Sequence, residues 1–250
     1  MKPLVTDAQR VVTFCLRQTT REGTTIMSHS AWLFVASLAI GVAAPAKAQL
    51  VAARQSPHSC MMRVSDRTQE AGCYIIAMET LGSLPAKPLF WHIYSYPGLE
   101  PARRAKGTST GVAVESLGRA WLFKIAPADW KPTNGRREAM IGPLSVLPGK
   151  TYVARYMESI IPPGPGGTPV HRHPGPEAWY LLDGVQCIRT PGKTVVLHAG
   201  ETAFVPGGVP MTLAHSQTAT RRALVLVLQD SSQPWMTKAN DWKPDTNCPE

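Results

Sequence analysis

The chain has 250 residues, enough for one or two domains of ordinary size. Hydrophobic residues make up 44% and charged residues 17%, with 23 prolines and 20 glycines, which excludes a disordered or long-helix protein and favours strands joined by turns. The formal net charge is +9, but basic pairs such as Arg103-Arg104 and Arg221-Arg222 are scattered. We interpret them as solvated surface and expect no nucleic-acid partner.

Residues 1–48 are interpreted as a leader and signal peptide. An apolar stretch from 31 to 46 leads into a small-x-small tripeptide, which predicts cleavage after Ala48. The stretch is short for a membrane span, which needs about 20 apolar residues, so we expect no stable span after cleavage. Translation from Met1 and from Met27 would give the same mature protein, which we expect to be secreted or periplasmic.

Four cysteines remain after this cleavage, at positions 60, 73, 187 and 248. In an oxidising compartment, four cysteines indicate up to two disulfides, with three connectivities that the sequence leaves open. The most local pairing joins Cys60 and Cys73. No C-x-x-C or C-x-x-H spacing is present, so a zinc site with thiolate ligands is not expected.

Residues 49–134 are interpreted as an N-terminal extension or a degenerate half-repeat. Apolar runs bounded by turn residues predict strands at 73–80, 89–96, 111–116 and 120–125. The run 99–106 predicts one short helix at most, so the extension is a small β or α/β layer. The sequence ADWKPTN at 128–134 echoes NDWKPDTN at 240–247, and coincidence explains this better than a repeat because the rest does not align.

Residues 127–142 are rich in proline, glycine and charge, which indicates a boundary before a barrel domain at 140–232. A C-terminal tail follows at 233–250. Within the barrel domain we predict strands at 144–162, 177–184, 185–190, 193–200, 201–208, 210–216 and 220–229, each bounded by turn residues. Short strands at steady spacing predict a closed barrel or a sandwich.

Two histidines and a glutamate form the motif with the clearest chemistry. In a strand, residues i and i+2 share a face, so His171 and His173 point the same way. The Pro-Gly-Pro turn after them delivers Glu177 at the head of the next strand. Two imidazoles and one carboxylate can complete a 2-His-1-carboxylate metal face.

The segment HRHPGPEAWYLLDG at 171–184 reads H-x-H-x3-E-x6-G, which resembles the first signature of the cupin superfamily. GETAFVPGG at 200–208 resembles its second signature, G-x5-P-x-G. The resemblance covers about residues 140–230. It implies a mainly β fold, a double-stranded β-helix barrel, with a divalent Fe, Mn or Zn ion bound by His171, His173 and Glu177.

One position departs from the family pattern. A histidine usually follows the second signature by three residues and serves as a fourth ligand, but here that position is Met211. A thioether is a soft ligand that suits Mn²⁺ or Fe²⁺ poorly. His215 lies four strand residues further on, about 13 Å along the backbone, so it could be a ligand only through a bulge or a shifted register. The ligand set therefore has three members or the site is weak or empty.

Strand alternation also suggests residues of a substrate pocket. Trp179 and Leu181 share parity with Glu177, so we expect them to line the barrel interior. Phe204, Met211 and Tyr156 are further candidates for its wall.

The metal-ligand motif is the only motif in the sequence that indicates a reaction chemistry, because no nucleophile motif or phosphate-binding loop is present. We therefore expect an exported metal-dependent enzyme, of oxygenase or oxidase type, that acts on a small molecule. The alternative is a cupin that binds or senses a small molecule without turnover, because the fold does not decide function. A homodimer is compatible with either interpretation.

Overall fold

The computed structural model describes residues 59–214, 216–244 and 248. The predicted leader at 1–48 and the candidate ligand His215 lie outside this part of the chain. The described part is mainly β, as predicted, with the α-helix α1 (Leu99–Lys106) and the short 3-10 helices η1 (Ser59–Met61) and η2 (Val64–Asp66). None of its helices has the length and apolar character needed to cross a membrane.

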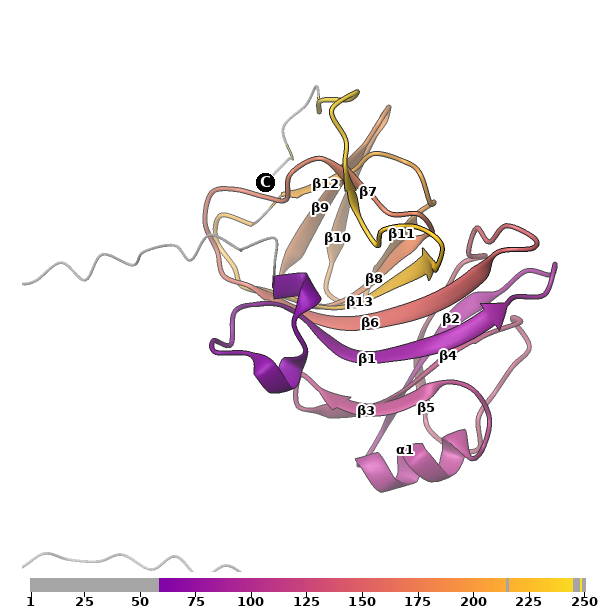
Figure 1. Cartoon of the computed structure of the whole chain (residues 1–250). Helices are drawn as coiled ribbons and strands as arrows, with labels where there is room; N and C mark the ends of the chain where they lie inside the picture. Colours follow the sequence, from indigo (N-terminus) through magenta and orange to yellow (C-terminus); the bar gives the residue numbers. More distant parts are fainter. Residues whose placement is uncertain (1–58, 215, 245–247, 249–250) are drawn as a thin grey trace, which may run out of the picture. The chain divides into compact units, whose positions relative to one another are not determined.

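A five-stranded antiparallel sheet runs through the middle of the fold (Figure 1). Its strands, in spatial order, are β1 (Gly72–Ser83), β6 (Thr151–Ile161), β13 (Arg221–Asp230), β8 (Glu177–Asp183) and β11 (Thr202–Val205). The N-terminal strand β1 pairs with β6 along its whole length, so the segment before the barrel motif contributes a strand to the same sheet.

Two small sheets lie over one face of this central sheet and close the barrel (Figure 1). The first contains β10 (Lys193–His198), β9 (Val185–Thr190) and β12 (Thr212–Ala214). The second pairs β14 (Thr237–Lys238) with β7 (His171–Arg172), so the chain after the barrel returns to the metal motif.

A four-stranded sheet covers the other face of the central sheet. It contains β3 (Val112–Ser116), β4 (Arg119–Ala126), β2 (Phe90–Tyr96) and β5 (Arg136–Ile141), with α1 packed on its outer side (Figure 1). Phe123 of β4 stacks on Tyr156 of β6 at a centroid distance of 5.3 Å, which joins the two sheets.

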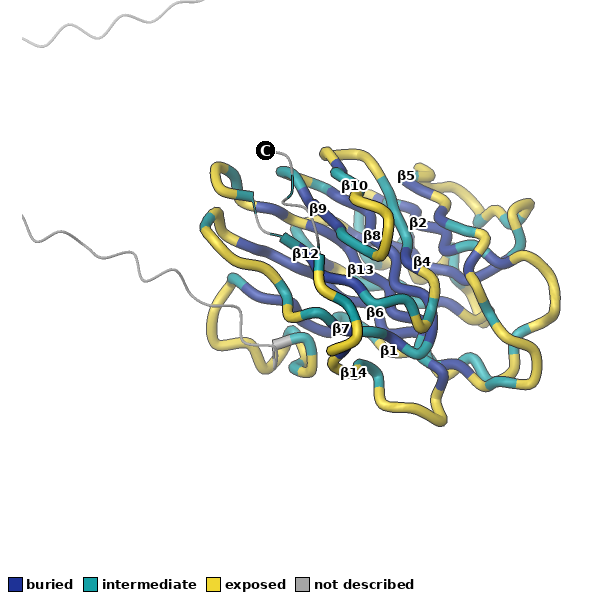
Figure 2. Tube along the Cα trace, turned by 90° about the horizontal axis from the view of Figure 1, so that it is seen from above, coloured by how far each residue is buried: buried dark blue, intermediate teal, exposed yellow. Residues whose placement is uncertain are grey.

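The middle strands of the central sheet, β6, β13 and β8, are mostly buried, as the dark strands of Figure 2 show. On β13, Leu224, Leu226 and Leu228 face the four-stranded sheet, and Ala223, Val225 and Val227 face the barrel interior. Because successive strand residues point to opposite faces, burying both faces requires an unbroken apolar run. This explains why RRALVLVLQ shows no alternation of polar and apolar residues.

The segment 127–142, interpreted from the sequence as a boundary, contains the strand β5. Its residues Arg136 and Arg137 are exposed, whereas Ala139 and Ile141 are buried against β2. The strand lies at the edge of its sheet, where exposed charged residues are common. Its composition therefore resembles that of a loop.

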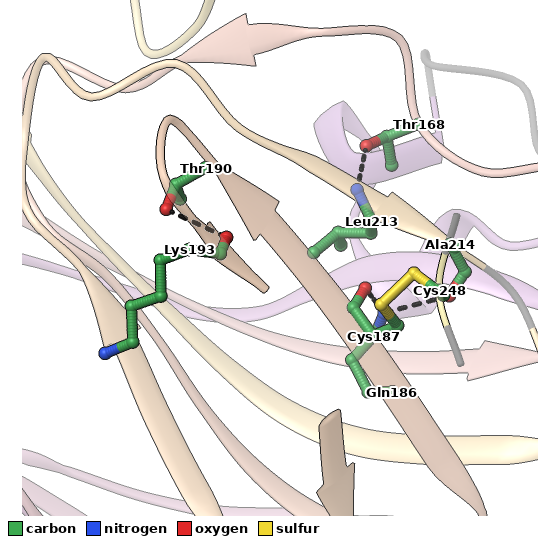
Figure 3. Close-up of a disulfide and its surroundings, with 8 residues drawn as sticks. All are labelled: Thr168, Gln186, Cys187, Thr190, Lys193, Leu213, Ala214 and Cys248. Atoms are coloured by element: carbon green, nitrogen blue, oxygen red, sulfur yellow. Dashed lines mark hydrogen bonds between the residues drawn. A yellow bond between two sulfur atoms is a disulfide. The ribbon is translucent and has the colours of Figure 1, made fainter. Parts of the chain in front are cut away.

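A disulfide joins Cys187 of β9 to Cys248, with the two Cα atoms 6.0 Å apart (Figure 3). Beside it, the Gln186 side-chain amide donates to the carbonyls of Cys187 and Ala214 at 2.8 and 3.1 Å, which fastens β9 to β12. The most local pairing, between Cys60 and Cys73, is not formed, and both residues are thiols. The observed link closes a loop across 61 positions, and local spacing gives no sign of it.

Candidate metal centre

The structure brings the three predicted ligands together. His171 belongs to β7, His173 follows it directly, and Glu177 opens β8 after the Pro-Gly-Pro turn. All three are buried, with 5–6% of their surface exposed, and their candidate ligand atoms lie within 4.8 Å of one another. The group could therefore hold one metal ion.

Backbone carbonyls fix the orientation of both imidazole rings. Nδ1 of His171 lies 2.8 Å from the carbonyl oxygen of Pro169, and Nδ1 of His173 lies 2.6 Å from that of Trp235. Since a carbonyl can only accept, each Nδ1 carries the hydrogen and each Nε2 has a free lone pair in the neutral ring. This is the tautomer of a histidine that binds metal through Nε2.

The carboxylate of Glu177 completes the arrangement. Its Oε2 lies 3.0 Å from Nε2 of His173 and 4.0 Å from Nε2 of His171. The closer approach lacks hydrogen-bond geometry, and Oε2 is a buried oxygen without a hydrogen-bond partner. Ligands bound at about 2.1 Å around one ion are separated by such distances, so these donors fit a divalent cation.

Burial and charge act differently on the two histidines. Burial lowers the pKa of His171 and outweighs the nearby Glu177 carboxylate, which raises it. Burial is also the largest single cause at His173 and acts downward, but Glu177 and the Trp235 carbonyl together raise its pKa above the ordinary value. A proton therefore competes with a metal ion chiefly at His173.

Close backbone contacts hold the ligand-bearing turn in place. The Gly208 amide, in the second signature, donates to the His173 carbonyl at 2.9 Å. A Cβ atom on Gly175 would lie 1.9 Å from the Leu228 carbonyl oxygen, so only glycine fits there without a shift. The second signature thus supports the turn that carries the ligands.

A cavity of about 340 Å³ opens beside the ligands. Its wall contains all three ligands and is otherwise largely apolar, with contributions from Trp179, Met157, Leu213, Val225 and Trp235. Cys60 and Met236 also line it, so segments from both ends of the described chain help to form it. The segment predicted as a tail therefore contributes directly to the site.

The predicted pocket residues divide between two faces of the central sheet. Trp179 lines the cavity as expected, whereas Leu181 and Met211 are buried in the barrel core beyond its wall. Tyr156 and Phe204 pack on the opposite face, against the four-stranded sheet, which corrects their assignment to the pocket. The side chains of successive strand residues point to opposite faces of the sheet. Tyr156 and Phe204 are each next in sequence to residues that face the barrel interior, so they face the other way.

Met211, at the sequence position where the family pattern predicts a fourth ligand, pairs with His171 in the structure. Its amide and carbonyl exchange hydrogen bonds of 2.9 and 3.0 Å with the backbone of His171. Residues directly opposite in an antiparallel pair share a face, so the Met211 side chain lies on the same side as the His171 imidazole.

One arginine that lines the cavity was missed by the sequence interpretation. Arg221 is 5% exposed and lines the cavity, although it was expected at the surface. The Arg155 guanidinium lies 5.2 Å from the ring centre of Trp235, a cation–π contact behind the cavity wall. The signal that could have located Arg221 is its shared parity with Val225 and Val227, which face the barrel interior.

The fold is a β-barrel that contains a cavity of small-molecule size and a candidate metal centre. Residues 157–227 match the family model described as a cupin domain, which supports assignment to the cupin superfamily. No curated protein sequence matches the chain significantly.

Solved structures similar to this chain include three of different kinds. The DMSP lyase DddQ from Ruegeria pomeroyi DSS-3 is 23% identical, over 34% of this chain and 42% of that one, with a TM-score of 0.30. The polyketide cyclase RemF from Streptomyces resistomycificus is 26% identical, over 37% and 63%, with a TM-score of 0.31. A cupin-like protein from Thermotoga maritima MSB8 is 16% identical, over 34% and 64%, with a TM-score of 0.32. The chain thus spans less than two thirds of each of them.

Proposed function

We propose that this chain is an exported metal-dependent enzyme of oxygenase or oxidase type that acts on a small molecule in the barrel cavity. The observation that carries the proposal is the geometry of three buried donors, His171, His173 and Glu177, at the wall of a largely apolar cavity. A 2-His-1-carboxylate group with an open side is typical of non-haem Fe²⁺ sites.

The residues of the chain prepare this site in three ways. The Pro169 and Trp235 carbonyls hold the imidazoles in the metal-binding tautomer, and the Glu177 carboxylate supplies the negative charge that a divalent cation requires. Apolar neighbours such as Trp179 exclude water, which strengthens electrostatic interactions within the cavity. When bound, Fe²⁺ would supply dioxygen chemistry, and Zn²⁺ or Mn²⁺ would supply Lewis-acid chemistry.

The disulfide between Cys187 and Cys248 supports export, because such links persist in oxidising compartments. Determining the N-terminus of protein recovered from outside the cytoplasm tests this part of the proposal. A chain that begins at Gln49 is the expected result, and an intact leader on cytoplasmic protein would contradict it.

The first experiment is elemental analysis of the mature protein, followed by oxygen uptake with a panel of small organic acids and alcohols. Stoichiometric iron with substrate-dependent uptake supports the enzyme. His171→Ala and Glu177→Ala should each abolish metal content while the barrel remains folded. His198→Ala, which changes an exposed histidine of β10, is the matched control and should retain the metal. Unchanged metal content in the first two variants would remove this site from consideration.

A second candidate function is small-molecule binding without turnover. It is favoured by Met211, which stands where a fourth ligand is expected and offers a thioether that suits Fe²⁺ or Mn²⁺ poorly. Metal-free protein that gains thermal stability from a ligand would support the binder over the enzyme.

A further inference from the structure

Arg221 is a buried cation at the wall of the cavity. It is the first residue of β13, and its guanidinium donates from Nη2 to the Ser159 hydroxyl at 2.8 Å. Nη1 is buried and has no hydrogen-bond partner. Burial lowers the pKa of Arg221 to about 10, so the side chain still carries its charge at neutral pH.

No acidic group in the described part of the chain balances this charge at ion-pair distance. Glu177 favours the charged form of Arg221 but forms no ion pair with it. A hydrogen bond with Cys60 and burial raise the pKa of Cys73 well above the ordinary value, so Cys73 is a neutral thiol there. Since a buried charge without a counter-ion costs free energy, an anion that enters the cavity beside Arg221 would be stabilised there.

The other residues of the cavity wall indicate the size and polarity of such an anion. The lining of the cavity contains apolar side chains such as Met157, Leu213 and Val225, together with Ser159, Thr168 and Lys238. The indole Nε1 of Trp179 is a second buried donor without a partner. A volume of about 340 Å³ lies at the small end of the range for ligand sites, roughly 300–1,000 Å³.

We propose that Arg221 binds the carboxylate of a small organic acid whose apolar body lies in the cavity and whose other end faces His171, His173 and Glu177. This inference rests on the proposed function and assigns its substrate class. The planar guanidinium fork matches a carboxylate in geometry as well as in charge. Arg221 is thus a residue for binding and specificity.

The test uses 3-phenylpropionate and its neutral analogue 3-phenylpropionamide as probes, titrated calorimetrically into the metal-loaded mature protein. The wild type should bind the acid about 10- to 100-fold more tightly than the amide, as expected for a charge-assisted hydrogen bond. Arg221→Met should lose this preference. Equal affinity of the wild type for both probes, or binding of neither, would overturn the proposal.

The adjacent residue provides the control. Arg222 is exposed and lies 3.6 Å from Asp183 on the surface, so Arg222→Met removes the same charge from the same strand outside the cavity. It should keep the preference for the acid. The same loss of preference in both variants would indicate a general charge effect and would refute the assignment.

Stability and metal content separate the alternatives. Arg221→Met should melt at a higher temperature than the wild type without ligand, because it replaces an unbalanced buried charge with an apolar group. A lower melting temperature would assign Arg221 a structural role. If the protein fails to bind a metal ion but still prefers the acid through Arg221, the metal enzyme is refuted and the anion site is not. Bound metal without preference for the acid would refute only the anion site.

Discussion

Gly175 provides a direct test of how the fold positions the metal ligands. The residue lies in the turn between His173 and Glu177, and a Cβ atom there would lie 1.9 Å from the Leu228 carbonyl oxygen. Real Cβ atoms essentially never approach closer than 3.0 Å, so Gly175→Ala must separate the turn from β13 by about 1.1 Å. The backbone of Gly175 has no positive φ, so the strain is steric alone.

A shift of this size exceeds what a metal site tolerates. Metal–ligand distances hold within about 0.2 Å, and ligand positions within about 0.5 Å, of their productive values. We therefore expect Gly175→Ala to weaken metal binding by at least about 10- to 100-fold, the typical cost of disturbing a supporting contact. The shift also breaks the 2.9 Å hydrogen bond from the Leu228 amide to the Pro176 carbonyl, which costs about 1–3 kcal/mol of stability.

The measurement is metal content after dialysis against a competing chelator, combined with thermal unfolding. Gly98→Ala is the matched control, because a Cβ atom there meets only Pro101 Cδ at 3.9 Å and the backbone φ is −178°. It should leave metal content unchanged. If Gly175→Ala retained metal as firmly as the wild type, the argument that the close turn positions the ligands would fail.

Three further predictions follow from the fold and the site. Met211→His should tighten metal binding in a competition assay, because position 211 faces the ligand cluster from the opposite strand, and unchanged affinity would exclude it as a ligand position. Replacing Cys187 and Cys248 by serine should lower the free energy of unfolding by about 4 kcal/mol in urea titrations, since the link closes a loop across 61 positions, whereas an unaltered midpoint would show that the bond is not formed. Burial lowers the pKa of His92, so the unfolded chain binds a proton at about pH 6.5 before the folded chain does. Thermal stability should therefore fall as the pH drops below about 6.5, and His92→Gln should show a smaller fall; identical pH profiles would contradict this.

Local sequence patterns were sufficient to predict most strands and the helix. The runs predicted at 73–80, 89–96, 111–116 and 120–125 correspond to β1 to β4, and the run 99–106 is α1. The four strands have apolar stretches that end at turn residues. The edge strand β5 escaped prediction because only one of its sides is apolar.

The three ligands were also predictable, since their positions depend on two-residue strand periodicity and on one short turn. The residues of the pocket wall could not be predicted from the same periodicity. Alternation identifies a buried face only where the other face is polar, and both faces of the central sheet are buried. Tyr156 and Phe204 were therefore assigned to the wrong face, and Arg221 was interpreted as surface.

Contacts between distant segments lie outside what local patterns can reveal. The Trp235 carbonyl orients His173 from a position 62 residues later in the sequence, and Cys60 reaches the cavity from before the first strand. Neither residue carries a motif. Their roles follow from the return of β14 to β7 and from the pairing of β1 with β6.

Three of the buried polar atoms that lack a hydrogen-bond partner belong to residues of this cavity, while others, such as Trp91 Nε1 and His92 Nδ1, lie elsewhere in the fold. Glu177 Oε2, Trp179 Nε1 and Arg221 Nη1 each lack a hydrogen-bond partner, and all three residues line one cavity. Each such atom left without a partner costs about 1–3 kcal/mol. The residues that line this cavity thus carry one acceptor and two donors without hydrogen-bond partners. A cation at the acceptor and an organic acid at a donor would satisfy groups that have no hydrogen-bond partner within the described protein, and this links the proposed metal site to its proposed substrate class.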